Sequence, residues 1–183
     1  MISKINQILE FTEKNNEKIY KKLEQTSLYC FALAKAINLN PKDKELAYYA
    51  GLLHDIGKTK ISKNILNKPK DSMSVDEMKE FQKHTLYSEC MLMFIDGFEE
   101  LPLIIKSHQE NWDGSGYPDK IKKQEIPVIS RVLLIASDYY TMRYEEHMEH
   151  EEAVEKLISG SNIKYDGNMI EPFIDIIEQE ELL

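Results

Sequence analysis

The sequence predicts an all-α fold, and three observations support this class. Apolar residues in most segments recur at helical rather than alternating spacing. The 183 residues include only seven glycines and six prolines, many of them grouped at a few places, so long stretches lack turn residues. A hydrophobic content of 42% in a chain of this length suffices for a sizeable core. We therefore expect a single helical bundle over residues 1–183.

The first part of the chain predicts three helices. Residues 3–38 have the apolar spacing of two helices that are interrupted near residues 15–16. Pro41 favours the first turn of the next helix, which runs through LAYYAGLLHD and stops at Gly57. A looser segment follows as far as Pro69.

The second part predicts further helices around one long loop. In DSMSVDEMKEFQKH, Ser74 is followed three residues later by Glu77, which is typical of a capping box at a helix start. Residues 111–127, NWDGSGYPDKIKKQEIP, are polar and dense in turn residues and predict a loop. The remaining helices are expected at residues 84–95, 100–109, 127–142, 150–159 and 169–180.

Composition excludes several classes of function. The formal charge of −9 argues against general nucleic-acid binding, because that affinity comes from basic side chains that neutralise phosphates. The net charge is still compatible with a small phosphorylated ligand that binds in a locally basic pocket. Cys30 and Cys90 form no CxxC pair, which fits a reducing cytoplasm. The N-terminus lacks a signal-peptide pattern and no apolar run approaches about 18 residues, so we expect neither export nor a membrane span.

The stretch LLHDIGKTKIS, residues 52–62, has two interpretations. It is either a helix end that reaches the surface or a metal site, and the dipeptide alone favours the helix end. Neighbours within a helix point about 100° apart, but a helix terminus lets His54 and Asp55 converge on one ion. Their nitrogen and oxygen donors suit Zn, Mn, Fe or Ni more than Ca. Lys58 either complements the helix dipole or binds phosphate.

The other histidines fall into two groups. His84 and His108 lie near predicted helix ends, like His54, although sequence spacing does not show that the three meet. His147 and His150 lie in the acidic run RYEEHMEHEE, which favours solvated side chains.

The loop HQENWDGSGYP begins at a histidine and is the most distinctive segment. Gly114 and Gly116 permit positive φ and close backbone approach, and Pro118 stiffens the exit. Two interpretations are open. The segment is a surface turn anchored in the core by Trp112, or it lines a functional site, as long ordered loops commonly do.

LLHDIGK and HQENWDGSGYP, present together and in this order, resemble the HD-GYP family, a branch of the HD phosphohydrolases. The resemblance covers roughly residues 20–180 and leaves residues 1–20 as an N-terminal helix outside it. It implies an all-α fold that holds two or three metal ions, often iron or manganese. It also implies hydrolysis of the second messenger cyclic di-GMP to pGpG or GMP.

The resemblance assigns roles to individual residues. His54, His84 and His108 match metal ligands, and Asp55 matches the carboxylate that bridges two ions. Asp55 and Lys58 are the expected catalytic residues, since the lysine approaches the substrate phosphate. A guanine base is expected to stack on an aromatic residue such as Trp112. The residues expected to bind substrate are Lys58, Trp112, Asp113, Gly114, Gly116, Tyr117, Pro118 and Arg143.

Several positions depart from the family pattern. Counting back from Leu39 and His54 places the first histidine ligand on Glu24, whose carboxylate still offers a donor. The second loop histidine falls on Gln109, a weaker neutral donor. The metal aspartate falls on Ser137, with Asp138 one place later.

Two further departures concern neighbouring segments. Ser88 stands where the family usually has glycine, and Arg143 is the only arginine near the segment that follows Asp138. We therefore expect Glu24 and Asp138 as additional metal ligands, and weaker phosphate binding than in an intact member.

The expected function is metal-dependent hydrolysis of cyclic di-GMP by metal-activated water, with one or two divalent ions. Iron or manganese is favoured, and zinc, nickel and magnesium are alternatives. One rival is a catalytically degenerate HD-GYP domain that binds a nucleotide or a protein partner in second-messenger signalling. Another is an HD hydrolase of a different phosphorylated small molecule. For the apolar stripe of the N-terminal helices two interpretations are open, a homodimer interface and intramolecular core.

Overall fold

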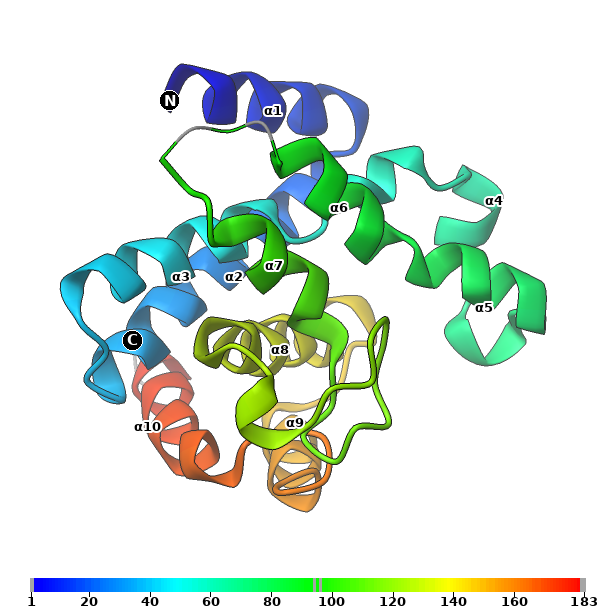
Figure 1. Ribbon diagram of the computed structural model, residues 1–183. Coiled ribbons are helices and arrows are strands. Elements are labelled where there is room, and N and C mark those ends of the chain that lie inside the picture. Colours follow the sequence, from blue (N-terminus) through cyan, green and yellow to red (C-terminus); the bar gives the residue numbers. More distant parts are fainter. Residues whose placement is uncertain (1, 94, 96, 182–183) are drawn as a thin grey trace.

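The computed structural model describes residues 2–93, 95 and 97–181, and these residues fold into helices without a β-strand (Figure 1). The predicted all-α class is confirmed. In chain order the α-helices are α1 (Ile2–Asn15), α2 (Glu17–Ala36), α3 (Pro41–Leu53), α4 (Lys63–Leu66), α5 (Val75–Gln82), α6 (His84–Leu92), α7 (Leu101–Lys106), α8 (Val128–Tyr140), α9 (His150–Ser159) and α10 (Ile170–Glu181).

The predicted helix starts are confirmed by their caps. The side chain of Asn16 accepts a hydrogen bond from the first turn of α2, which explains the break after α1. Asn40 caps α3 in the same way, and Pro41 occupies its first turn. Ser74 and Glu77 form the expected capping box on α5.

Several helix boundaries differ from the expectation. α6 ends at Leu92 rather than at residue 95, and α7 ends at Lys106 rather than at residue 109. α3 ends at Leu53 rather than Gly57, and a 3-10 turn follows at Ile56–Lys60. The segment expected to be loose contains α4. α8 continues into a π-helical turn, Thr141–Glu145. Residues 1, 94, 96 and 182–183 of the predicted domain lie outside the described residues, and residue 94 also belongs to the helix expected over residues 84–95.

The core forms where α2 packs against α3 and α8 (Figure 1). Gly51 permits the close approach of α3, because a Cβ atom there would lie 2.4 Å from the Cα atom of Ser27 on α2. The ring of Tyr29 packs edge-on against Tyr139 of α8 and Phe173 of α10, with ring centroids 5.5 and 5.8 Å away. This core fixes the ends of α2, α3 and α8 relative to one another.

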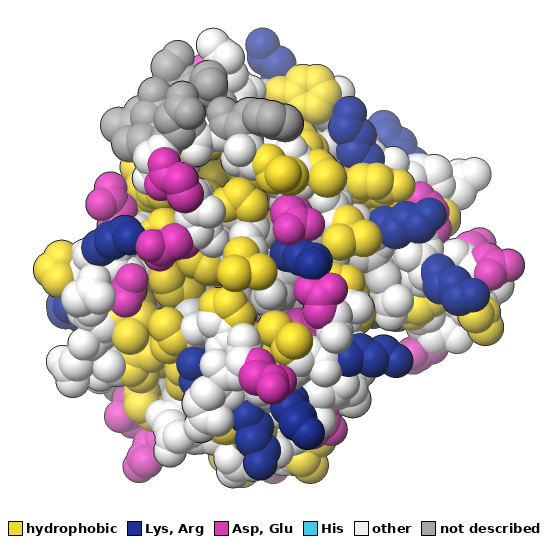
Figure 2. All heavy atoms as spheres, viewed as in Figure 1, with side chains coloured by type: hydrophobic (Ala, Val, Ile, Leu, Met, Phe, Trp, Pro, Cys, Tyr) yellow, Lys and Arg dark blue, Asp and Glu magenta, His cyan; other side chains and the backbone are white. Residues whose placement is uncertain are grey.

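The surface mixes charged and apolar side chains. Figure 2 shows lysine, arginine and acidic side chains interspersed with apolar ones over one face of the molecule. No helix in the described part of the chain combines the length and the apolar character needed to cross a membrane.

Candidate metal centre

Three helix ends bring His54, His84 and His108 together in the interior. His54 follows α3, His84 is the first residue of α6, and His108 lies in the 3-10 turn Ser107–Gln109 after α7. All three are at most 1% exposed. The ring centroid of His108 lies 5.2 Å from that of His54 and 5.4 Å from that of His84. The interpretation of LLHDIGK as a surface helix end is therefore wrong, because His54 and Asp55 are buried.

The three imidazole rings are oriented in the same way. Each Nδ1 atom lies 2.6 to 2.9 Å from the backbone oxygen three residues earlier, which makes Nδ1 the hydrogen-bond donor. Each Nε2 atom therefore keeps its lone pair, and none of the three has a hydrogen-bond partner among the described residues. Buried polar atoms without partners are rare, so this arrangement calls for a ligand.

The three Nε2 atoms lie near the carboxylate of Asp55. The Oδ2 atom lies 3.3 Å from Nε2 of His54, and Oδ1 lies 3.5 Å from that of His84 and 3.9 Å from that of His108. His54, Asp55 and His108 each offer one ligand atom, and these atoms lie within 4.8 Å of one another. Neutral imidazole and carboxylate donors fit a divalent transition metal.

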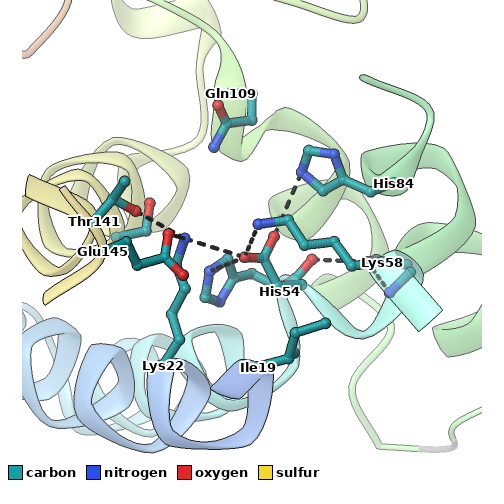
Figure 3. Close-up of polar contacts among 12 residues, drawn as sticks. Ile19, Lys22, His54, Lys58, His84, Gln109, Thr141 and Glu145 are labelled. Atoms are coloured by element: carbon teal, nitrogen blue, oxygen red, sulfur yellow. Dashed lines mark hydrogen bonds and ion pairs between the residues drawn. The ribbon is translucent and has the colours of Figure 1, made fainter. Parts of the chain in front are cut away.

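Two lysines contact the same carboxylate. The Nζ atoms of Lys58 and Lys22 lie 2.5 and 3.3 Å from Oδ2 of Asp55. Lys22 extends from α2, is buried, and donates to the hydroxyl of Thr141 at 2.9 Å, while a Glu145 carboxylate oxygen lies 3.8 Å from its Nζ (Figure 3). The centre therefore contains two fixed ammonium groups as well as the ligand atoms.

These charges control the ionisation of Asp55 and the two lysines. Burial alone would raise the pKa of Asp55, but Lys58, His54 and Lys22 hold it well below its ordinary value. Burial opposes the charge of Lys22, yet Asp55 and Glu145 raise its pKa above the ordinary value. Burial lowers the pKa of Lys58 to about 8 against the opposing effect of Asp55. At neutral pH the carboxylate is thus ionised and at least Lys22 is cationic.

The pKa values of two histidines favour the ligand state. Burial lowers the pKa of His84 to about 3 and that of His108 well below its ordinary value. Both rings are therefore neutral at pH 7, which is the form that binds metal.

Gly57 and Ser88 hold α6 against the turn that carries His54 and Asp55. A Cβ atom on Gly57 would lie 2.2 Å from the backbone oxygen of His84, so only glycine fits there. The hydroxyl of Ser88 donates to the backbone oxygen of His54 at 2.7 Å and accepts from the Gly57 amide at 2.9 Å. The serine found where the family usually has glycine thus fastens the two elements together.

The glycine-rich loop lies against the centre through Tyr117. Its hydroxyl donates to the side-chain oxygen of Gln109 at 3.1 Å, and its ring centroid lies 6.3 Å from that of His84. Gly114 has a positive φ of 86°, and Gly116 meets backbone so closely that a Cβ atom would lie 2.3 Å from the Asn111 nitrogen. The glycines therefore shape the loop as the sequence predicts.

Trp112 and Asp113 support the structure of the loop. Trp112 is 9% exposed, and the Arg131 guanidinium lies 5.7 Å from its ring centroid. This burial makes the ring an anchor and does not support stacking of a guanine on it. The exposed Asp113 side chain accepts from the Ser115 amide at 2.8 Å, and Pro118 follows Tyr117 at the loop's exit.

Glu24 does not reach the centre. It is exposed on α2, whereas Lys22, two residues earlier, is buried beside Asp55. Two residues turn a helical side chain by about 200°, so Glu24 points away from the face of α2 that carries Lys22. Sequence reasoning missed Lys22, although its position three residues after Ile19 and four before Thr26 places it on the buried stripe of α2.

Asp138 and Arg143 are also engaged elsewhere. The Asp138 carboxylate accepts from the Tyr165 hydroxyl at 2.9 Å and pairs with Lys164 at 2.6 Å. Arg143 donates to the backbone oxygen of Met148 at 2.6 Å. Ser137 is buried and donates to its own helix. The register shift that Asp138 needs in order to act as a ligand is not present in α8.

The acidic run holds its two histidines differently. His147 is exposed, as expected, but His150 is half-buried with its Nδ1 atom 3.0 Å from the Tyr139 hydroxyl. The expectation of a solvated side chain is therefore wrong for His150.

A cavity of about 700 Å³ opens beside Lys22 and Lys58. Although the whole chain carries a formal charge of −9, lysines outnumber acidic residues in this lining. The cavity is therefore locally basic. The charged residues that line it are Lys18, Lys22, Lys58, Lys68, Lys70, Asp71, Glu145 and Glu146.

Comparisons with known proteins agree with this arrangement. The model of the HD domain family matches residues 6–169, which includes most of α1. A protein of Vibrio cholerae serotype O1 named "Probable cyclic di-GMP phosphodiesterase" is 31% identical over 160 residues, covering 79% of this chain and 35% of that protein. The "3'3'-cGAMP-specific phosphodiesterase 2" of the same organism is 27% identical, covering 84% of this chain and 30% of its own length.

A solved structure shares the fold. An HDG"Y"P protein from Bdellovibrio bacteriovorus superposes with a TM-score of 0.74 at 24% identity, covering 86% of this chain and 51% of that one. The chain spans about a third of the length of the two curated relatives.

Proposed function

Because the chain belongs to the HD domain family and to its HD-GYP branch, we propose that it is a metal-dependent phosphodiesterase of cyclic dinucleotides, with cyclic di-GMP as first candidate. The observation that carries this proposal is the convergence of three buried Nε2 lone pairs on the Asp55 carboxylate. The names of the two curated relatives support a cyclic dinucleotide as substrate.

His54, Asp55, His84 and His108 would hold the metal. A divalent ion bound there supplies Lewis-acid activation of water and of the phosphate group. The donor groups are imidazole and carboxylate. Neither cysteine belongs to the site, because Cys30 is buried in the core and Cys90 is exposed on α6. We propose iron or manganese, with zinc, nickel and magnesium as the alternatives that metal analysis distinguishes.

Lys58 would bind the substrate phosphate. Its side chain is 13% exposed and lines the basic cavity, so its ammonium group faces both Asp55 and the space available to a ligand. A compact ammonium group offsets the charge of phosphate oxygens. Tyr117, packed beside His84, would limit the far side of the same site.

Metal analysis and turnover test the proposal together. The protein is purified without oxygen, its metal content is measured by mass spectrometry, and cyclic di-GMP and 3'3'-cGAMP are each added with Mn²⁺ or Fe²⁺. We expect bound metal and release of linear or mononucleotide product. Asp55→Ala should lose both the bound metal and the turnover. Asp76→Ala, on the exposed face of α5, should keep both. A metal-free, inactive wild-type protein would contradict the proposal. If the protein hydrolyses only another phosphorylated small molecule, that molecule replaces the cyclic dinucleotide as the proposed substrate.

A second candidate function is a signalling module that binds a cyclic dinucleotide or a protein without turnover. Lys22 beside Asp55 and the engagement of Gln109 by Tyr117 favour it, because both groups stand near the centre without acting as metal ligands there. Binding of cyclic di-GMP measured by calorimetry, with no product after prolonged incubation with metal, would favour this candidate.

We also propose a cytoplasmic location and a homodimer through α1 and α2. Phe11, Leu28 and Phe31 on these helices are 44% to 55% exposed, which leaves apolar surface for a second copy. Light scattering of the wild-type protein and of Phe11→Glu tests the dimer, since a monomeric wild type would exclude it.

A further inference from the structure

The two oxygens of the Asp55 carboxylate face different surroundings. Oδ1 faces the Nε2 atoms of His84 and His108, 3.5 and 3.9 Å away. Oδ2 faces the ammonium groups of Lys58 and Lys22, at 2.5 and 3.3 Å, together with His54. The Oδ1 edge of the carboxylate therefore meets lone pairs alone, whereas the Oδ2 edge meets two ammonium groups beside the lone pair of His54.

Lys22 is built into this position. Its side chain is 8% exposed, its ammonium group donates to the Thr141 hydroxyl, and Glu145 lies 3.8 Å away on the same π-helical turn (Figure 3). Thr141 and Glu145 come from the π-helical turn that follows α8, so three elements fix the ammonium group at Oδ2. A second divalent ion at that edge would have to displace it or bear its repulsion.

We propose that Lys22 takes the place of a second metal ion, so that the centre holds one divalent ion per chain. This inference rests on the metal binding proposed above and narrows it from one or two ions to one. Lys22 supplies the second cation as part of the polypeptide.

Metal stoichiometry tests the inference without any measurement of activity. Wild-type protein is reconstituted with Mn²⁺, dialysed, and analysed by mass spectrometry and by electron paramagnetic resonance. We expect one ion per chain and the spectrum of an isolated Mn²⁺ ion. Lys22→His removes the buried charge and adds a ligand nitrogen, so we expect two ions and the spectrum of a coupled pair. Lys21→His places the same imidazole on an exposed position of α2, so this control variant should still bind one ion per chain.

The outcomes separate this inference from the proposed function. A wild type without bound metal overturns the metal-binding proposal itself. A wild type with two ions overturns the role of Lys22 and leaves the phosphodiesterase proposal standing. If Lys22→His does not fold, as judged by circular dichroism, the metal content of Lys22→Gln is measured instead. This substitution removes the charge and keeps a side chain of similar length. One ion in that folded variant overturns the inference, and two support it.

Discussion

The ammonium group of Lys22 lies 3.3 Å from the Oδ2 atom of Asp55, so a buried ion pair joins α2 to the turn after α3. Their side chains are 8% and 2% exposed, and Lys58 contacts the same oxygen. One carboxylate thus contacts two ammonium groups away from solvent. A buried charge that loses its partner is strongly destabilising, so the pair couples the fold to the site.

Asp55→Asn should destabilise the metal-free protein strongly. The substitution leaves Lys22 and Lys58 without their shared counter-charge, and breaking a buried pair costs about 3–5 kcal/mol. Urea unfolding in the presence of a chelator measures the loss of unfolding free energy. In the double variant Asp55→Asn, Lys22→Met, part of the loss should return, because one of the stranded charges is gone. Equal stability of Asp55→Asn and wild type would show that the pair carries no net interaction.

Gly57→Ala should weaken both stability and metal affinity. The new Cβ atom would lie 2.2 Å from the His84 backbone oxygen and 2.6 Å from the Ser88 nitrogen, so α6 must move and take His84 with it. Overpacking of this kind costs about 1–3 kcal/mol. Thermal unfolding and Mn²⁺ calorimetry measure the two effects. Lys60→Ala, exposed in the same 3-10 turn, is the control, and a Gly57→Ala protein that behaves like this control would refute the close approach.

Removal of metal should lower the melting temperature, because an ion that binds the folded chain alone stabilises it by mass action. A free concentration about a hundred times the dissociation constant contributes about 2.7 kcal/mol. We therefore expect Mn²⁺ to raise the melting temperature of the wild type and a chelator to reverse the rise. Asp55→Ala should respond to neither. A rise of equal size in Asp55→Ala would place the ion at another site.

The fold was predictable from the sequence because its signals are local. The cap residues Asn16, Asn40 and Ser74 each bond within their own first turn, so each helix start follows from a few neighbouring residues. The 3-10 turn after α3 was not predictable in this way, because it depends on how closely Gly57 approaches α6, an element that follows later in the chain.

The candidate centre was predictable only in part. His54, Asp55, His84 and His108 follow from the family resemblance, and the structure brings them together. The sequence did not show whether Asp138 is a ligand, because its partners Lys164 and Tyr165 follow α9 in the chain.

Lys22 was missed for a geometric reason. A separation of two residues places Glu24 and Lys22 on different sides of the helix, and only the apolar stripe around Lys22 identifies the buried face.

The two cysteines should differ in reactivity and in their effect on stability at alkaline pH. Burial raises the pKa of the Cys30 thiol far above its ordinary value of 9.0, whereas Cys90 is exposed. A maleimide should therefore label one thiol in the native chain and two after denaturation. Because the folded-state pKa of Cys30 is raised, its contribution to stability is fully present below the unfolded pKa near 9 and is lost as the pH rises above it. Above that pH the loss reaches about 1.4 kcal/mol per pH unit.

Comparison of variants isolates this contribution from that of the other groups that titrate in the same range. Cys30→Ala should lose stability less steeply between pH 9 and about 10 than the wild type, as measured by urea unfolding in reducing buffer. Its lower stability at pH 7, from the lost packing in the core, shifts the whole curve without changing the slope. Cys90→Ala removes the exposed thiol and is the control, which should keep the wild-type slope. Equal slopes for Cys30→Ala and wild type would mean that the thiol reaches solvent in the native protein.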